Sequence, residues 1–511
     1  MKITNSYHQL GGDFYKEQQP DKIKNPQLIA FNQKLATELD IKIGEDAKYL
    51  VDIFAGNELL PNSKPISLAY AGHQFGHFVP QLGDGRAVLL GEIKDKNNIL
   101  HDIQLKGSGR SFFSRNGDGK CPLNSAIREY IVSEAMHYLK IPTTRSLAII
   151  KSDEFIQRDE FLPASIITRI AKSHIRIGTF EYFACRNDIK NLKILADYAI
   201  DRHFPEYSPQ NDKYLYLLKS VMNLQAELIA SWMSVGFIHG VMNTDNIAIS
   251  GQTLDYGPCA FIDEYESNKV FSFIDKSGRY SFSNQKNIIL WNLIKFAEAL
   301  LPLINNDIKK AVKAVEAELN QFAVLFDKIY YQKMSKKLGI SIFKNDQEDK
   351  NLIDDFLKIL EDNKIDFTNG FRILSKILLP ESNQEKTQGK TQGKTQGKTQ
   401  GKTQGNTKKT SFYVADRKYL DWQEKWQNRL KKESSELNEI ATAMDKVNPI
   451  LIARNHIIAD IIQQSVFKND YSEFNEFLQA IQNPFTENKK YHKYYSPPQE
   501  HEKVLNTFCG T

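Results

Sequence analysis

The hydrophobic and polar positions in the first third of the chain predict two neighbouring strands followed by a helix. Residues 86–93 and 102–106 are short runs rich in Val, Leu and Ile, and the turn-forming residues 94–98 separate them. This pattern is typical of paired strands. From Pro122 to Pro142 apolar residues recur at helical spacing, and proline is favoured where a helix begins. We therefore expect a strand–strand–helix unit here.

The rest of the chain mixes strand-like and helix-like patterns. Residues 145–151 are typical of a strand, and residues 213–235 have a helical period that ends at Gly236. Beyond residue 410 the patterns are mostly helical and include residues 448–465. A group of strands followed by many helices favours the α+β class.

A stretch of low complexity interrupts the chain between Glu381 and Thr410. The tetrapeptide Lys-Thr-Gln-Gly occurs five times in residues 386–405. Nothing there can be buried to offset the entropy of ordering the backbone, so we expect a disordered insert. Gly-Lys-Thr also occurs in phosphate-binding P-loops, but those loops have four residues between their glycines and the repeats have three. We therefore assign the repeats no nucleotide-binding role.

The charge balance gives no support for a nucleic-acid partner or a membrane surface. The 511 residues include 67 Lys and Arg against 62 Asp and Glu, a formal net charge of +5. Seven lysines and no acidic residue lie between Lys386 and Lys409, so the remaining chain has 60 basic and 62 acidic residues. A nearly neutral folded part lacks the electrostatic attraction that these partners require.

The sequence contains no convincing membrane span or targeting signal. Residues 288–304 are the best candidate, but Asn292, Lys295 and Glu298 interrupt them, and a span needs about 20 apolar residues. The N-terminus has no apolar signal region. Four cysteines without a Cys-x-x-Cys pair are too few for a disulfide framework. We expect a cytoplasmic protein.

The glycine-rich segment 83–86 (Gly-Asp-Gly-Arg) is the first group that suggests chemistry. Glycines let the backbone approach phosphate closely and arginine adds charge, although the same residues suit a plain tight turn. Lys106 ends the second predicted strand, and Glu129 lies on the helix that follows. In protein kinases a strand lysine paired with a helix glutamate holds the nucleotide phosphates. Together these positions predict an anion site.

A second group lies within residues 239–255. Kinase-like phosphotransferases use His-x-Asp-x-x-x-x-Asn and then Asp-x-Gly, where the Asn and the second Asp hold a metal. Asn246 and Asp255 occupy these two positions, and their oxygen ligands suit Mg²⁺ or Mn²⁺. Val241 stands where the catalytic aspartate belongs and cannot accept a proton, so Asp245 is the nearest substitute. The alternative is a loop stabilised by Asn and Asp hydrogen bonds.

Arg169 and Arg176 form a third candidate group. Their spacing of seven residues could place both on one face of a helix, and guanidinium groups suit phosphate. A solvated basic face would explain the same spacing.

Taken together, these residues resemble the selenoprotein O family. The motifs that carry the resemblance are Tyr70-Ala-Gly-His-Gln-Phe-Gly-His77, Gln81-Leu-Gly-Asp-Gly-Arg86, Gln104-Leu-Lys-Gly-Ser-Gly-Arg110, Ala126-Ile-Arg-Glu-Tyr130, His239-Gly-Val-Met-Asn-Thr-Asp-Asn246 and Asp255-Tyr-Gly-Pro258. The resemblance implies a protein-kinase-like two-lobed fold, with an additional N-terminal segment and a helical C-terminal extension.

Together with the low-complexity insert, which is unlike the family core, this resemblance implies four parts. Residues 1–160 would hold the N-terminal extension and a nucleotide-binding N-lobe, and residues 161–380 a helical C-lobe with the catalytic and metal loops. Residues 381–410 would be the disordered insert, and residues 411–511 would form a helical part packed on the C-lobe.

The resemblance also implies a protein adenylyltransferase that transfers AMP from ATP to Ser, Thr or Tyr hydroxyls of other proteins. Diphosphate would be released with the help of Mg²⁺ or Mn²⁺, and ATP would bind inverted relative to kinases. Asp245 would accept the proton, Asn246 and Asp255 would hold the metal, and Glu129 would position Lys106. The nucleotide contacts would be Gly83, Gly85, Arg86, Lys106, Asp118, Gly119, Arg169, Arg176 and Asp255. We expect a monomer without nucleic-acid or membrane partners.

The C-terminal end departs from the family pattern. Some members end in Cys-x-x-selenocysteine, whereas this chain ends in Phe508-Cys509-Gly510-Thr511. The resemblance suggests that Cys259, which follows the Asp255 motif, can form a redox pair with Cys509. Two unrelated cysteines are the alternative.

Two other functions fit parts of the pattern. An ordinary kinase-like phosphotransferase would use the same metal pair, but Val241 lies at the position of its catalytic base. A catalytically inactive kinase-like scaffold would not need the lysine, the glutamate and the metal pair, all of which the sequence contains.

Deleting residues 386–405 should leave AMP transfer and the melting temperature nearly unchanged. A polar insert contributes no core, and the entropy of closing a loop changes only slowly with its length. Calorimetry would measure the melting temperatures of the deletion variant and the unmodified chain, and initial rates of AMP transfer would be compared for the same two proteins. A large drop in melting temperature would show that the repeats are structural.

Overall fold

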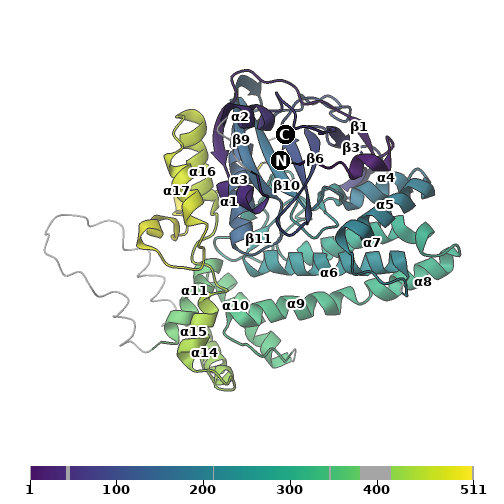
Figure 1. The fold of residues 1–511 in the computed structure, drawn as a ribbon. Coiled ribbons are helices and arrows are strands. Elements are labelled where there is room, and N and C mark those ends of the chain that lie inside the picture. The colour runs from purple at the N-terminus through teal and green to yellow at the C-terminus, as the bar shows by residue number, and fades with distance from the viewer. Residues whose placement is uncertain (1, 42–46, 211, 345–346, 380–415, 509–511) are drawn as a thin grey trace.

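The computed structural model describes residues 2–41, 47–210, 212–344, 347–379 and 416–508. The expectations for the repeats and for Cys509 lie outside these residues. The described chain is mixed α/β, with most strands in its first third and helices through most of the rest (Figure 1).

An antiparallel sheet carries the first group of candidate residues. Its strands are β1 (Tyr15–Glu17), β2 (Gln27–Phe31), β3 (Ile66–Leu68), β6 (Ala87–Lys94), β7 (Leu100–Lys106), β8 (Cys121–Pro122), β9 (Arg145–Gln157) and β10 (Phe161–Ala171). Their order is β1-β3-β6-β7-β10-β9-β2, and β8 pairs with β10. The predicted strands at 86–93, 102–106 and 145–151 are confirmed as β6, β7 and β9. Because β10 is a central strand, the sheet continues past residue 160, where we expected the first part to end.

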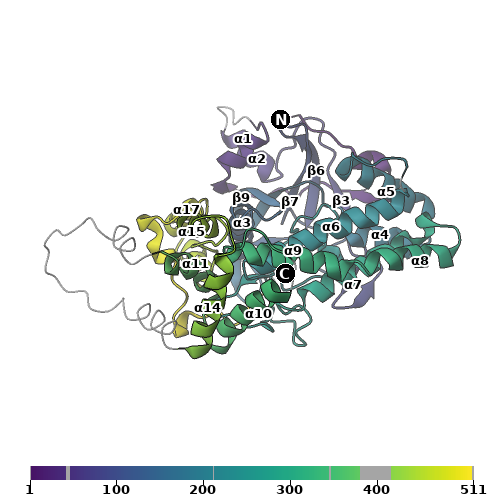
Figure 2. The ribbon, with the colours of Figure 1, turned by 90° about the horizontal axis from the view of Figure 1, so that it is seen from below.

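Helices pack on the sheet and fill the other side of the molecule (Figures 1 and 2). The sheet contacts α1 (Gln33–Glu38), α2 (Ala47–Phe54) and α3 (Leu123–Tyr138). The central helices are α4 (Ile177–Ala184), α5 (Ile189–His203), α6 (Lys213–Ser234), α7 (Gln285–Ile304), α8 (Ile308–Leu319), α9 (Phe322–Lys337), α10 (Gln347–Asp362) and α11 (Phe367–Ile377). The C-terminal helices are α14 (Arg417–Leu430), α15 (Leu437–Asp445), α16 (Asn455–Ile462) and α17 (Ser472–Ala480). The helices predicted at 122–142 and 213–235 are confirmed as α3 and α6.

Alternate side chains of the sheet enter two separate hydrophobic cores. Val88 and Leu105 belong to the core that contains residues of α1 and α2. Leu89 and Ile167 belong to the larger core that contains α3 and the central helices. Successive residues of a strand face opposite sides, so the same strands contribute to both cores.

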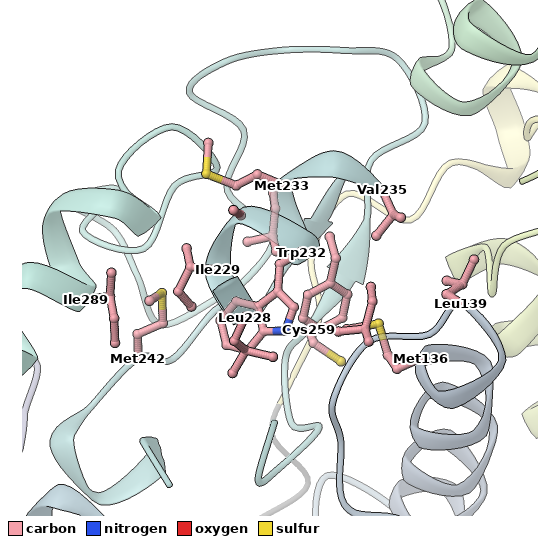
Figure 3. Close-up of a cluster of buried hydrophobic side chains, with 14 of the residues drawn as sticks. Met136, Leu139, Leu228, Ile229, Trp232, Met233, Val235, Met242, Cys259 and Ile289 are labelled. Atoms are coloured by element: carbon pink, nitrogen blue, oxygen red, sulfur yellow. The ribbon is translucent and has the colours of Figure 1, made fainter. Parts of the chain in front are cut away.

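A buried cluster joins α3 to the central helices. In Figure 3, Met136 of α3, Trp232 of α6 and Ile289 of α7 belong to one group of apolar side chains, which also includes Cys259. Trp232 Nε1 donates to Thr253 Oγ1 at 2.9 Å, so the polar atom of the indole is satisfied inside the core. This cluster holds α3 and the central helices together.

The C-terminal helices pack against the central helices and against α3. Trp422 Nε1 of α14 donates to the backbone oxygen of Leu352 in α10 at 2.8 Å. The ring centre of Phe474 in α17 lies 5.9 Å from the ring centre of Tyr130 in α3.

The helix expected at 448–465 begins only at Asn455, because the preceding segment serves a buried ion pair. Arg454 Nη1 lies 2.6 Å from Asp263 Oδ1 and 2.8 Å from Asp366 Oδ2, and the arginine side chain is 1% exposed. Its backbone is extended, with φ −64° and ψ 141°. The pair ties the C-terminal part to the central helices.

Among the described residues, one helix is long and apolar enough to cross a membrane by length and composition. This helix is α7, and half of its most apolar window is buried inside the structure. A core helix passes the same test, so length and composition are weak evidence for a span.

Arg454→Met should lower the free energy of unfolding by about 3–5 kcal/mol, because it leaves the buried carboxylate of Asp366 and the partly buried carboxylate of Asp263 without their cation. Urea titration followed by tryptophan fluorescence would measure the change. Lys432→Met is the control, since it removes only an exposed ion pair with Glu348 and should cost less than about 1 kcal/mol. Equal losses in the two variants would contradict a structural role for the buried pair.

Candidate active site

One cavity of about 500 Å³ collects candidate residues from distant parts of the sequence. It lies where the sheet meets the segment that follows β11 (Phe237–Ile238). Its lining includes Gly83, Gly85, Arg86, Lys106, Asp118, Gly119, Arg169, Arg176, Asp245, Asn246 and Asp255. Glu129 is not part of the lining but contacts two of the lining side chains.

Four charged side chains form a network in the wall of this cavity. Lys106 Nζ, at the end of β7, lies 2.6 Å from Glu129 Oε2 and 2.8 Å from Asp255 Oδ1. Arg169 on β10 donates to the other oxygen of Glu129 and, at 2.8 Å, to Asp255 Oδ1. Lys106, Glu129 and Arg169 are buried, which is tolerable because each charge is paired.

The network keeps both of its carboxylates ionised. Burial alone would raise the pKa values of Glu129 and Asp255. The positive charges of Arg169 and Lys106 outweigh burial, so the pKa of Glu129 is lowered and the pKa of Asp255 is held well below its usual range. Both groups therefore carry a negative charge at neutral pH.

Arg169 and Arg176 do not share a helical face, and that suggestion from their spacing was wrong. Strand β10 ends at Ala171, so Arg169 lies in a strand whereas Arg176 precedes the first turn of α4. Both side chains are buried and line the cavity, which also excludes a solvated basic face. Arg176 packs on the ring of Tyr70, with 4.1 Å from Cζ to the ring centre, and donates to the backbone oxygen of Asp245 at 3.1 Å.

Asp245 lies in the short 3-10 turn Thr244–Asn246, against the hairpin of β4 (Gly72–Gln74) and β5 (His77–Val79). A Cβ atom at Gly72 would lie 2.9 Å from Asp245 Oδ1, so a side chain there would crowd the carboxylate. Oδ1 is buried and has no hydrogen-bond partner among the described residues. Burial raises the pKa of Asp245 to about 6, although the charge of Arg176 opposes the rise. This carboxylate is suited to accept a proton from a ligand.

The β4–β5 hairpin holds the turn that carries Asp245. The backbone nitrogen of His73 donates to Thr244 Oγ1 at 2.7 Å, and that of Phe75 donates to Asn243 Oδ1 at 3.0 Å. Gln74, between these two residues, lines the cavity. The motif at residues 70–77 thus fixes the backbone around Asp245.

Asn246 and Asp255 supply oxygen atoms that fit a hard divalent cation. Asn246 Nδ2 donates to the backbone oxygen of Val241 at 3.1 Å, which leaves its side-chain oxygen for a ligand. Asp255 lines the same cavity and stays ionised, as shown above. One carboxylate and one amide oxygen suit Mg²⁺ or Mn²⁺ that is also bound by phosphates. Within the described ranges, no group of three or more His, Cys, Asp or Glu side chains forms a metal site.

The glycine-rich segment packs closely against the loop between β7 and β8 that contains Asp118 (the Asp118 loop). Gly83 has a φ of +110°, and a Cβ atom there would lie 2.3 Å from the ring of Phe113. Ser111 Oγ donates to the backbone oxygen of Asp84 at 2.6 Å. Only a residue without a side chain fits at Gly83, so the glycine is required by this packing as well as by its φ angle.

Our reading of the sequence missed Arg158, which lines the same cavity. Arg158 follows β9 in the turn to β10, and its two terminal nitrogens donate to the two carboxylate oxygens of Asp118 at 2.8 and 2.9 Å. Nothing in the neighbouring sequence distinguishes Arg158 from an ordinary turn residue. Its position follows from how the β9–β10 hairpin extends beside the Asp118 loop.

Cys259 is buried in the cluster of Figure 3, and burial raises the pKa of its thiol to about 11. Thr507 Oγ1 donates to the backbone oxygen of Pro258 at 2.6 Å, so the end of the described chain reaches the residue before Cys259. Since Cys509 is outside the described residues, its pairing with Cys259 stays a prediction.

Comparison with known proteins identifies relatives along the whole chain. A family model described as Protein adenylyltransferase SelO matches residues 1–482. A protein named nucleotidyltransferase YdiU from Rhodopseudomonas palustris is 43% identical over 514 residues, which cover 100% of this chain and 99% of the relative. The proteins of that name from Clostridium perfringens and Agrobacterium fabrum are each 44% identical over 512 residues, which cover 100% of this chain and 98% and 100% of the relatives.

The relatives named nucleotidyltransferases extend over the full length of the chain, and the family model covers the sheet, the cavity and most of the helices. The resemblance found in the sequence motifs is thereby confirmed. The chain is a nucleotidyltransferase and belongs to the SelO family of protein adenylyltransferases.

Proposed function

We propose that this protein transfers AMP from ATP to Ser, Thr or Tyr hydroxyl groups of other proteins and releases diphosphate. The observation that carries the proposal is Asp245, a carboxylate that lines the same cavity as Lys106, Arg169 and Arg176 and whose pKa burial raises to about 6. Such a cavity combines a proton acceptor with cations suited to phosphates. Family membership supports nucleotidyl transfer as the reaction class.

We infer a protein-kinase-like arrangement, in which the sheet with α3 corresponds to the N-lobe and helices α4–α11 to the C-lobe. The contact between Lys106 of β7 and Glu129 of α3 supports this correspondence, because kinases use such a pair to hold phosphates. Asn246 and Asp255 then stand in the positions of the two metal ligands.

The cations act on the leaving group. As diphosphate separates, negative charge accumulates on the β- and γ-phosphates, and preorganised cations in a cavity stabilise that charge. Lys106 and Arg169 are held in place by Glu129, and Arg176 by its packing on Tyr70. These residues therefore need little rearrangement when charge develops.

Asp245 acts on the acceptor. Its carboxylate takes the proton from the attacking hydroxyl, the hydroxyl oxygen bonds to the α-phosphorus, and the bond to the bridging oxygen of diphosphate breaks. A pKa of about 6 leaves this carboxylate mostly ionised at pH 7. When bound at Asn246 and Asp255, Mg²⁺ or Mn²⁺ would neutralise phosphate charge.

The test uses ATP labelled at the α- or the γ-phosphate, incubated with the protein and acceptor proteins. Protein-bound label from the α-position alone is the expected result. Label from the γ-position would indicate an ordinary kinase, and label from neither would favour an inactive scaffold.

Asp245→Asn should lower kcat for AMP transfer by about 10²–10⁴-fold, because the amide has the same shape but cannot act as the base. ATP affinity should change by less than about threefold, which corresponds to less than 1 kcal/mol. Initial rates and equilibrium ATP binding would be measured on the same preparations. A variant with near-normal kcat would show that another group accepts the proton.

A further inference from the structure

The outer part of the cavity contains a charged contact that the mechanism above does not use. Arg158 Nη1 donates to Asp118 Oδ2 at 2.8 Å, and its Nη2 donates to Asp118 Oδ1 at 2.9 Å and to the backbone oxygen of Lys120 at 3.3 Å. Arginine suits this paired geometry, because its planar guanidinium presents parallel N–H groups to a carboxylate. The orientation of the Asp118 carboxylate is therefore set by the β9–β10 hairpin.

The same hairpin contacts the Asp118 loop a second time. Lys120 Nζ forms an ion pair with Glu154 of β9, and the backbone nitrogen of Lys120 donates to Asp118 Oδ1 at 3.0 Å. Two contacts from one hairpin thus hold the loop, but only that of Arg158 reaches the carboxylate of Asp118. Removal of the contact between Glu154 and Lys120 is therefore a matched control for removal of the contact between Arg158 and Asp118.

Asp118 remains ionised and accessible to a ligand. Its hydrogen bonds with Arg158 are the main cause of a lowered pKa, and partial burial opposes them. The side chain is 41% exposed and lines the cavity. Each carboxylate oxygen can accept more than one hydrogen bond, so the bonds with Arg158 leave capacity for a further donor.

The charge of Asp118 decides which part of a nucleotide it can meet. A carboxylate repels phosphate groups but accepts hydrogen bonds from N–H and O–H groups. On the proposed function, the phosphates lie against Lys106, Arg169 and Arg176, whose side chains are only 6–7% exposed. Asp118 and Arg158 are more exposed, at 41% and 20%, and so lie nearer the cavity mouth. The nucleoside end of the ligand is then the part that faces Asp118.

We propose that Arg158 is a positioning residue, which holds the Asp118 carboxylate so that it accepts a hydrogen bond from the nucleoside end of the bound nucleotide and thereby contributes to nucleotide selectivity. The donor is an N–H group of the base or an O–H group of the ribose. The inference rests on the proposed function for the direction in which the nucleotide binds.

The experiment measures equilibrium binding of three nucleotides to the full chain that carries Asp245→Asn, so that no turnover interferes. The nucleotides are ATP, inosine triphosphate, which has an oxygen in place of the adenine amino group, and 2′,3′-dideoxyATP, which lacks both ribose hydroxyls. We expect ATP to bind about tenfold more tightly than one of the two analogues, as the loss of one hydrogen bond to a charged group predicts. The analogue that binds weakly identifies the donor.

Arg158→Gln should weaken ATP binding and reduce this preference to less than about threefold. Asp118→Asn should do the same, and the double variant should be no worse than the single variants, because residues that act through one another are not additive. Glu154→Gln, which removes the second contact of the hairpin, should keep the preference. Arg158→Lys keeps the charge without the paired geometry and should be intermediate.

The proposal is overturned if ATP and both analogues bind equally well, if Arg158→Gln keeps the preference, or if Glu154→Gln loses it equally. Melting temperatures of all variants show whether each one folds, and Arg158→Lys with Asp118→Asn completes the test if Arg158→Gln does not. Binding is measured without turnover. Failure to find α-phosphate label in the unmutated protein would therefore count against the proposed function and not against the role of Arg158.

Discussion

The need to pair buried charges organises this protein around Lys106, Glu129, Arg169 and Asp255. An unpaired charge in a protein interior costs several kcal/mol, so these side chains are stable only when they meet. They come from β7, α3, β10 and the segment before β12 (Ala260–Phe261). Their pairing therefore fixes the helix against the sheet and brings the segment that carries Asp255 to the same wall. The cavity and its ionised carboxylates follow from this arrangement.

Close backbone packing is the second constraint, and it acts around Asp245. Gly72 lies against Asp245, and a Cβ atom at Gly178 would lie 2.1 Å from the backbone oxygen of Ala71. The absence of side chains lets the β4–β5 hairpin, the start of α4 and the turn of Asp245 approach one another. Burial of Asp245 results from this approach and raises its pKa. Small residues thus contribute to the chemistry by removing water from a carboxylate.

Local patterns in the sequence predicted the elements that carry most of the site. The strands β6 and β7 and the helix α3 were found because their hydrophobic periods are set by neighbouring residues. The same reasoning failed for Arg169 and Arg176, where a spacing of seven was compatible with a helix but a strand ends between them. It also failed before Asn455, where a buried ion pair of Arg454 keeps the backbone extended. In both cases residues distant in sequence decide the local conformation.

By itself, the sequence determined the types and order of the main elements, the residues with suitable chemistry and the family. Each of these depends on short-range periodicity or on motifs that lie within a few residues. Only the tertiary structure decided which charges meet, because Lys106 is 149 positions from Asp255, and Arg158 is 40 positions from Asp118. Strand pairing and helix packing bring such residues together, and burial then sets their ionisation. The role of Arg158 is consequently invisible in its own neighbourhood of the chain and follows only from the fold.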